Sequence, residues 1–365
     1  MPDFTIARLT NKPDQEEALA RIDAWFRQEV IDRPPIRFTG HNTEHNVAPL
    51  KKFEPTARWK TLKDRWFDAE YQVDSFIASI WNKRFLAETF PVFMPNLGPE
   101  VYSAFYGCEL IYQEITSYCV PKVRAWSDMD QLVFDRQNEY FLKIEEMTRL
   151  ALEKCEGSYW VGYTDLHPGG DCAAAWRDPQ QFCMDLVHEP DHVKTLVTKA
   201  SYDFLNIYDY FDNILKKHAQ PSITWMGIPS SGRMHIPSCD FSSMISSRYF
   251  EEYFLPAIQK EVGTMTHNIF HLDGKGVARH LDLLLELPEI HAIQWVQGLG
   301  KDQPILQWLP LIRKILDAGK SVLLEIKPEE LKPLLRDVGT KGLMLSMGGG
   351  QDIQENVIDF LMRSK

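Results

Sequence analysis

The sequence predicts an α/β protein, a single (β/α)₈ TIM-type barrel over residues 1–365 with a helical N-terminal extension over about 1–34. The main observation is that short apolar runs alternate with helical patterns from about residue 222 onward, which is typical of β-α units and a parallel sheet. The second is composition: 365 residues with 44% hydrophobic and 25% charged side chains are ordinary for a globular chain with an ample core.

Five strand–helix units can be followed through the second half of the chain. The apolar runs lie at 222–229, 268–274, 292–298, 321–328 and 342–350. The helical patterns that follow them lie at 247–262, 276–287, 304–319, 329–339 and 351–365. Ser247 is a suitable N-cap for the first of these helices, and Gly319 ends the third as a C′ glycine. Such units fit a (β/α)₈ barrel or a doubly wound sheet.

The first half of the chain is less regular. Helices are expected at 16–30, 61–85, 134–155 and 191–219, and strands at 36–40, within 87–101, within 109–123 and at 159–166. Because five units cannot close a barrel alone, the first half must supply the missing strands. We therefore expect one domain rather than two.

Charge and cysteine usage exclude several classes of protein. The formal net charge is −11 and the sequence has no cluster of basic residues, so binding to nucleic acid or to an anionic membrane is not expected. No apolar stretch approaches the ~18 residues of a transmembrane helix, and no secretory signal is visible. The six cysteines contain no CxxC pair, so neither a disulfide framework nor a thiolate zinc site is expected. We predict a cytoplasmic protein.

Polar side chains follow nearly every predicted strand, and in a parallel barrel the reacting groups lie at these strand ends. The candidate catalytic residues are Asp165, His167, Asp240, His271 and Glu325. The candidate substrate-binding residues are His41, His45, Asn96, Trp160, His235, Asp273 and Trp295. Structural alternatives remain open, since 41–46 fits a plain polar loop and Asp165 fits a helix cap. The glycines at 348–350 fit a turn or an anion nest, but no nucleotide motif is present and no nucleotide cofactor is expected.

The segments 239–261, 270–298, 317–322 and 341–350 resemble the uroporphyrinogen decarboxylase-like superfamily, and 89–110 and 164–179 resemble it more weakly. The resemblance implies a single TIM-type barrel and a homodimer. It also implies one of two chemistries. These are porphyrinogen decarboxylation, and methyl transfer to or from a corrinoid protein by zinc-dependent methyltransferases.

The departures from the superfamily pattern narrow this choice. The decarboxylases carry an Arg-rich segment for the substrate carboxylates, whereas here only Arg33, Arg37 and Arg233 are expected near the mouth. Decarboxylation of uroporphyrinogen is therefore not expected. The thiol-activating methyltransferases use His-x-Cys and a later Cys as zinc ligands. In this chain the matching segment ends in Asp273, and no cysteine follows Cys239.

A zinc site with His and carboxylate ligands, as in members that cleave methyl ethers, stays open. Its expected ligands are His271 and Asp273, with His167, His235 or Glu325 as the third.

Three functions follow as hypotheses. The first is a corrinoid-linked methyltransferase or O-demethylase that acts on a small molecule. The second is a metal-free lyase or hydrolase that uses paired carboxylates on a polyhydroxylated, sugar-like substrate. The third, a barrel that only binds a ligand, is the least favoured, because it has little use for so many titratable strand-end groups. An oligomer is expected in each case.

Overall fold

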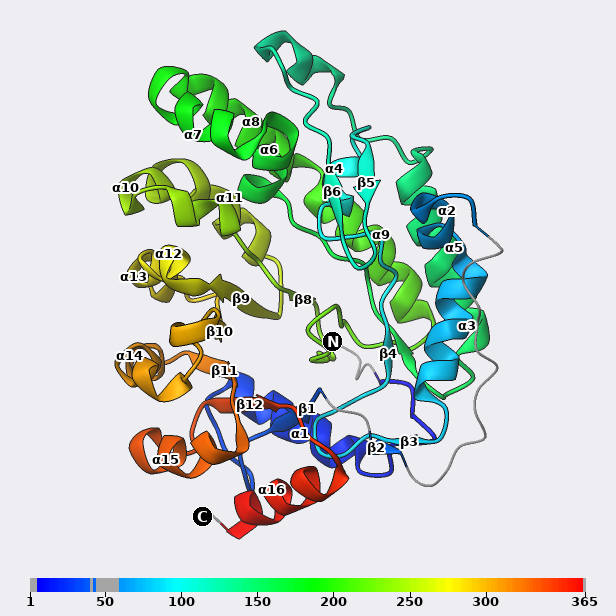
Figure 1. Cartoon of the computed structure of the whole chain (residues 1–365), viewed down its shortest axis with the longest axis vertical. Helices are drawn as coiled ribbons and strands as arrows, with labels where there is room; N and C mark the ends of the chain where they lie inside the picture. The colour runs from blue at the N-terminus through cyan, green and yellow to red at the C-terminus, as the bar shows by residue number, and fades with distance from the viewer. Residues whose placement is uncertain (1–4, 40–41, 44–58, 364–365) are drawn as a thin grey trace.

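The computed structural model describes residues 5–39, 42–43 and 59–363 (Figure 1). Its centre is a parallel sheet that curls, with helices packed along its outer side (Figure 1). The six strands follow the order β1 (Ile36–Phe38), β12 (Leu343–Met347), β11 (Ser321–Glu325), β10 (Ala292–Val296), β9 (His267–Asp273) and β8 (Met234–His235). The predicted α/β class and parallel sheet are confirmed.

The predicted complete eight-stranded barrel is not confirmed. Strands β4 (Val92–Phe93) and β7 (Trp160–Val161) form a separate parallel pair. A backbone hydrogen bond from Glu88 to Ile36, at 2.9 Å, joins this region to β1 of the main sheet. Another, from Tyr163 to Ile223 at 3.0 Å, joins it to the segment that precedes β8. A continuous ladder is interrupted here because prolines precede and follow β4, and proline lacks the N–H that a ladder needs.

The second half confirms the predicted alternation of strands and helices, except that its first strand lies later in the sequence than predicted. The helices that follow strands β8 to β12 are α10 (Ser247–Tyr249) with α11 (Leu255–Val262), α12 (Gly274–Ala278) with α13 (Leu281–Leu285), α14 (Leu309–Asp317), α15 (Pro328–Val338) and α16 (Gln351–Arg363). The run 222–229 forms only an isolated bridge between Ser222 and Ser230. A turn at Gly227, which has a φ of 67°, breaks this run, and β8 begins after it.

The first half departs further from its predicted elements. Its helices are α1 (Gln15–Phe26), α2 (Leu62–Trp66), α3 (Ala69–Ile80), α4 (Val101–Ala104), α5 (Glu139–Lys154), α6 (Gly169–Arg177), α7 (Pro179–His188), α8 (Pro190–Tyr202) and α9 (Phe204–Lys217). Two predicted helices are each split in two: Asp68 caps α3, and Asp203 separates α8 from α9. The small strands β2 (Asn42–Thr43) and β3 (Lys83–Arg84), and β5 (Leu110–Tyr112) and β6 (Ser117–Cys119), form antiparallel pairs outside the main sheet.

Two hydrophobic clusters show which way the strands face. Ile269, Ala292, Leu323 and Met344 pack together in the smaller cluster, on the concave side of the sheet. Their chain neighbours Phe270, Ile293, Leu324 and Leu345 belong to the larger cluster with the surrounding helices. Because strand side chains alternate, the residues two positions beyond the first set also face the concave side.

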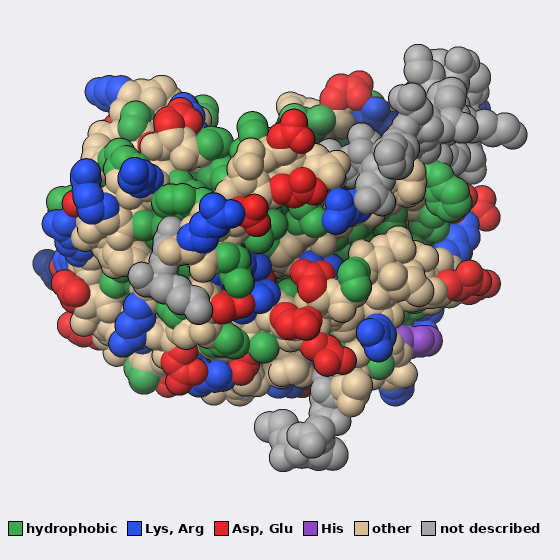
Figure 2. All heavy atoms as spheres, turned by 90° about the horizontal axis from the view of Figure 1, so that it is seen from below, with side chains coloured by type: hydrophobic (Ala, Val, Ile, Leu, Met, Phe, Trp, Pro, Cys, Tyr) green, Lys and Arg blue, Asp and Glu red, His purple; other side chains and the backbone are tan. Residues whose placement is uncertain are grey.

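The predicted N-terminal helix is present as α1, and it covers the amino end of the sheet. The Trp25 Nε1–H donates to the Gly342 carbonyl at 3.0 Å, and the Ser321 hydroxyl donates to the Trp25 carbonyl at 2.5 Å. On the face shown in Figure 2, basic and acidic side chains are interspersed. Across the described part of the chain, no helix has the length and apolarity to span a bilayer.

Candidate active site

A polar layer lies above the apolar floor on the concave side of the sheet. It is formed by the next inward-facing positions of five adjacent strands: His271, Gln294, Glu325, Ser346 and Arg37. The register pairs His271 with Gln294, Glu325 with Ser346, and Ser346 with Arg37. Parallel strands therefore bring these residues to one carboxyl-terminal level, as the strand-end rule predicts.

Three potential metal ligands converge at one edge of this layer. One ligand atom each from Asp240, His271 and Asp273 lies within 4.8 Å of the other two. His271 and Asp273 share a face of β9 because they are two residues apart, and Asp240 begins the short 3₁₀ turn 240–244 after β8. An imidazole and two carboxylates are a suitable set of three protein ligands for a catalytic zinc ion.

Gln294 orients the imidazole of this cluster. Its Oε1 lies 2.7 Å from Nδ1 of His271. Since an amide oxygen only accepts, Nδ1 carries the hydrogen and Nε2 keeps the free lone pair. The ring of Trp225 meets the His271 ring edge-on, with 5.3 Å between centroids. His271 is thus held as the tautomer that can bind a metal through Nε2.

A chain of hydrogen bonds lies beside the cluster. His167 contacts Asp165 through Nε2 at 2.7 Å and Ser238 through Nδ1 at 2.8 Å. Ser238 donates its single hydroxyl hydrogen to Asp171, also at 2.8 Å, so both ring nitrogens of His167 must donate. Burial opposes this charge, but Asp165 and then Asp171 and Asp240 outweigh it and raise the pKa of His167 to about 9.

The far end of this chain holds Asp240 in place. The carboxylate of Asp171 accepts hydrogen bonds from the backbone N–H groups of Asp240 and Phe241, at 3.2 and 3.0 Å. Burial and then the Asp171 carboxylate raise the pKa of Asp240 to about 6, against the effect of His271.

A cavity of about 330 Å³ opens beside Asp240. His167, Asp171 and Ser238 line it together with Glu100 and Phe241. Its size suits a small molecule, and Asp240 belongs both to the cavity wall and to the cluster of candidate ligands. The cavity and the candidate metal site therefore share Asp240.

The remaining predicted site residues lie elsewhere. Glu325 is in the polar layer but outside the three-residue cluster, where Asp240 takes the place expected for a third ligand. Trp160 is fully buried in the concave core and Trp295 packs on the outer side against Trp308, so neither is placed to contact a ligand. Asn96 is exposed and its side chain accepts the backbone N–H of Gly98. His41 and His45 lie outside the described residues.

Of the three arginines expected at the mouth, only Arg37 reaches the polar layer. Arg33 is buried against Glu88, with Nη1 to Oε2 at 2.7 Å. Arg233 precedes β8 and pairs with Asp209 at 2.6 Å. Among the described residues, Arg37 is therefore the one of these three arginines that faces the candidate site.

His235 points away from the site, into the outer core. Its Nε2 lies 3.5 Å from Oε2 of Glu261 on α11, and both side chains are almost completely buried. Neither these atoms nor His235 Nδ1 has a hydrogen-bond partner among the described residues. Burial lowers the pKa of His235 to about 3 and raises the pKa of Glu261 to about 8, so both are neutral at pH 7.

We expect Glu261→Gln to change how stability depends on pH. The pKa of Glu261 in the folded state, about 8, lies above that of the unfolded chain, so the wild type loses stability as pH rises from about 4.5 to 8. The neutral amide removes this loss. The variant should match the wild type near pH 5 and exceed it by on the order of 2–4 kcal/mol at pH 8 in urea denaturation. An equal difference at both pH values would contradict the assignment.

Sequence reasoning missed Asp171, Ser238, Gln294 and Glu100. Asp171 lies four residues after the candidate His167, but its role depends on contacts with the distant residues 238–241. Gln294 would have been found by counting inward positions along 292–296. Nothing in the local sequence distinguishes Ser238 or Glu100.

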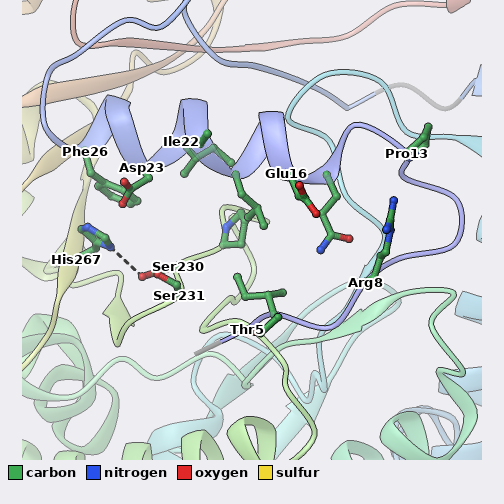
Figure 3. Close-up of a pocket in the computed structure, with 15 residues that line it drawn as sticks. Thr5, Arg8, Pro13, Glu16, Ile22, Asp23, Phe26, Ser230, Ser231 and His267 are labelled. Atoms are coloured by element: carbon green, nitrogen blue, oxygen red, sulfur yellow. Dashed lines mark hydrogen bonds between the residues drawn. The ribbon is translucent and has the colours of Figure 1, made fainter. Parts of the chain in front are cut away.

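A second cavity, of about 460 Å³, lies at the opposite end of the sheet (Figure 3). Its wall is formed by α1 and by Ser230, Ser231 and His267, the last at the amino end of β9. His267 stacks on Phe26 with 4.0 Å between centroids and contacts Ser230 Oγ through Nδ1 at 2.8 Å. Most of its lining is apolar, and no candidate metal cluster is found there among the described residues. The candidate active site is therefore the strand-end cluster.

The fold and this site define an α/β protein with a strand-end cluster of one histidine and two carboxylates. The structure is similar to that of a methyltransferase from Methanosarcina mazei, with a TM-score of 0.58 over 93% of this chain and 97% of that chain. The two sequences are 11% identical, so the likeness shows that the two chains share a fold. No protein-family model and no curated protein sequence matches the chain.

Proposed function

We propose that the protein is a zinc-dependent methyltransferase or demethylase that acts on a small methylated molecule. The observation that carries this proposal is the convergence of Asp240, His271 and Asp273 at the strand ends of a methyltransferase-like fold. A corrinoid protein as the methyl carrier, a homodimer of single-domain chains and a cytoplasmic location belong to the same proposal.

The residues present fit a zinc ion. Nε2 of His271 and one oxygen each of Asp240 and Asp273 would hold it, because Gln294 already occupies Nδ1 of the histidine. A zinc ion bound there supplies Lewis-acid polarisation of the heteroatom that carries the methyl group. None of these three candidate ligands is a cysteine, whereas sites that activate thiols use thiolate-rich ligands. The ligand set therefore favours a substrate whose methyl group is carried by oxygen or nitrogen rather than by sulfur.

The protein's own groups would orient the substrate and stabilise the charge that develops on it. The cavity beside Asp240 holds a small molecule against the cluster, and the imidazolium of His167 lies in its wall. The positive charge of this ring would stabilise negative charge that develops on a departing oxygen or nitrogen. Asp165 and Ser238 fix the orientation of that ring from both sides.

Metal analysis and single-turnover methyl transfer test the proposal together. The purified protein should bind about one zinc ion per chain, and the zinc form should transfer a methyl group from a small methoxylated or N-methylated compound to a reduced corrinoid. Treatment with a chelator should abolish transfer, and added zinc should restore it. Failure to bind zinc, or transfer that continues without it, would refute the proposal.

Gln294→Leu should weaken zinc binding by about 10–100-fold, because the ring of His271 loses its orienting acceptor. Gln294→Glu keeps an acceptor at Nδ1 and should bind zinc at least as well as the wild type. Competition with a chromophoric chelator measures both affinities. Equal affinity in the wild type and the leucine variant would contradict the orienting role.

A metal-free hydrolase is the second candidate, because Ser238, His167 and Asp165 form a hydrogen-bonded series with distances of 2.8 and 2.7 Å. The electrostatics disfavour it. With a pKa of about 9, His167 already carries the proton that it would have to accept from Ser238 at neutral pH. Ester hydrolysis that is abolished by Ser238→Ala and unaffected by a chelator would favour this candidate instead.

A further inference from the structure

Glu100 is an acidic residue in the wall of the cavity beside Asp240 that the proposed chemistry does not use. It directly precedes α4, and one of its carboxylate oxygens, Oε2, accepts the backbone N–H of Cys119 on β6. Among the described residues, the other oxygen, Oε1, has no hydrogen-bond partner, and no lysine or arginine pairs with this carboxylate. One oxygen of a carboxylate in the cavity wall is therefore free to accept a hydrogen bond from a ligand.

The loop before Glu100 is fixed against the pair of strands β5 and β6. The Ser117 hydroxyl donates to the Leu97 carbonyl at 2.8 Å, and a Cβ at Gly98 would lie 1.7 Å from Ser117 Oγ. Gly98 has a φ of 106°, a conformation that residues with a Cβ rarely adopt. Together with the hydrogen bond from Cys119, these contacts hold the carboxylate of Glu100 at a fixed position, so that little ordering is needed when a ligand binds.

The other charged side chains in the cavity wall already have partners. His167 is paired with Asp165 at 2.7 Å, and Asp171 accepts hydrogen bonds from a serine hydroxyl and from two backbone N–H groups. Asp240 belongs to the candidate metal cluster. Glu100 is thus the carboxylate of the described wall that neither a set of hydrogen-bond donors nor the metal cluster accounts for.

An unpaired carboxylate is costly at this position because it is largely withdrawn from water. Burial raises the pKa of Glu100 above its usual value, the hydrogen bond from Cys119 opposes this effect, and the Asp171 carboxylate adds to it. A cation bound beside Oε1 would remove part of the cost, because an opposite charge stabilises a desolvated one. Glu88 shows such a pairing in the same chain, since Arg33 contacts both of its oxygens at 2.7 and 2.9 Å.

Most of the remaining cavity wall is apolar. The apolar side chains that line it include Pro99, Ala174, Ala175, Pro179, Phe241 and Met244. A ring or a short hydrocarbon packs well against such side chains, and the volume of about 330 Å³ lies within the range of small-molecule sites. The cavity therefore suits a ligand with an apolar body and one positive group.

We propose that Glu100 anchors a protonated amino group of the substrate, whose methyl-bearing oxygen or nitrogen then lies against Asp240 and the metal cluster. This inference rests on the proposed function and names its substrate class as methylated compounds that carry a separate basic amino group. A protonated amine supplies both the hydrogen-bond donor and the positive charge that pair with a carboxylate oxygen. An anionic substrate would instead be repelled by the carboxylates of Glu100, Asp171 and Asp240.

Binding to the metal-free full-length protein tests this anchor independently of catalysis. The probes are 4-methoxybenzylamine and its uncharged counterpart 4-methoxybenzyl alcohol, measured by isothermal titration calorimetry after chelator treatment. The wild type should bind the amine at least about tenfold more tightly than the alcohol. Glu100→Gln keeps an oxygen acceptor for the Cys119 N–H but removes the charge, so it should reduce this preference to about twofold or less.

Glu109→Gln is the matched control, because it removes the same charge from an exposed residue nine positions later that does not line the cavity. It should retain the wild-type preference. If Glu100→Gln does not fold, Glu100→Asp decides, since it keeps the charge on a shorter side chain and should lower the preference at least about threefold.

The inference is overturned if the wild type shows no preference for the amine, or if neither Glu100 variant changes it. Loss of the preference in Glu109→Gln would also overturn it, because the effect would then follow net charge alone. A wild type that prefers the amine but binds no zinc would refute the proposed function and leave the anchor standing. A wild type that binds zinc without this preference would do the reverse.

Discussion

His271→Ala is expected to lower zinc affinity by about 100-fold or more, which exceeds the effect of changing the orienting Gln294. The reason is that two carboxylates, Asp240 and Asp273, would remain as ligands, and zinc sites in proteins are typically built from three or four. At zinc concentrations that saturate the wild type, the variant should be only partly occupied by zinc. Its rate of methyl transfer should fall in proportion to that occupancy. Competition with a chromophoric chelator gives the affinity, and single-turnover assays at several zinc concentrations give the activity.

His218→Ala is the matched control for this experiment, because His218 is exposed at the end of α9, outside the cluster. It should bind zinc as the wild type does. Equal affinity in the His271 and His218 variants would show that the strand-end cluster does not bind zinc.

The sequence predicted the strand-end location of the site because parallel β-α units bring their carboxyl ends to one level. His271 and Asp273 could be recognised as neighbours on one face, since they are two residues apart on a strand. Trp295 illustrates the limit of this reasoning. Neighbouring residues of a strand face opposite sides of the sheet. On β10 the inward-facing residue is Gln294, so Trp295 faces outward.

Asp240 could not be placed at the metal cluster from the sequence. Its position depends on hydrogen bonds from its own backbone and that of Phe241 to Asp171, about seventy residues earlier in the chain. Contacts of this kind arise from tertiary packing rather than from local propensity. The same limit applies to the first half of the chain, where prolines around β4 interrupt the ladder.

The second large effect that we expect is a loss of folding stability at the junction between β1 and the first-half strands. Glu88 is fully buried and its carboxylate binds Arg33 through both oxygens, at 2.7 and 2.9 Å. It also accepts the backbone N–H of Ile36 at 2.6 Å and contacts Arg21 at 3.3 Å. The Glu88 side chain therefore neutralises the buried Arg33 and fixes the position of the first residue of β1.

Glu88→Gln should lower the free energy of unfolding by about 3–5 kcal/mol, because the amide keeps the shape of the carboxylate but leaves Arg33 buried without an anion. Urea denaturation followed by tryptophan fluorescence measures this loss. Glu114→Ala is the control, since Glu114 pairs with Arg65 at 2.7 Å with 74% of its side chain exposed, and its removal should cost less than about 1 kcal/mol. If the two variants lost equal stability, the buried pair would not be what holds β1 to the first-half strands.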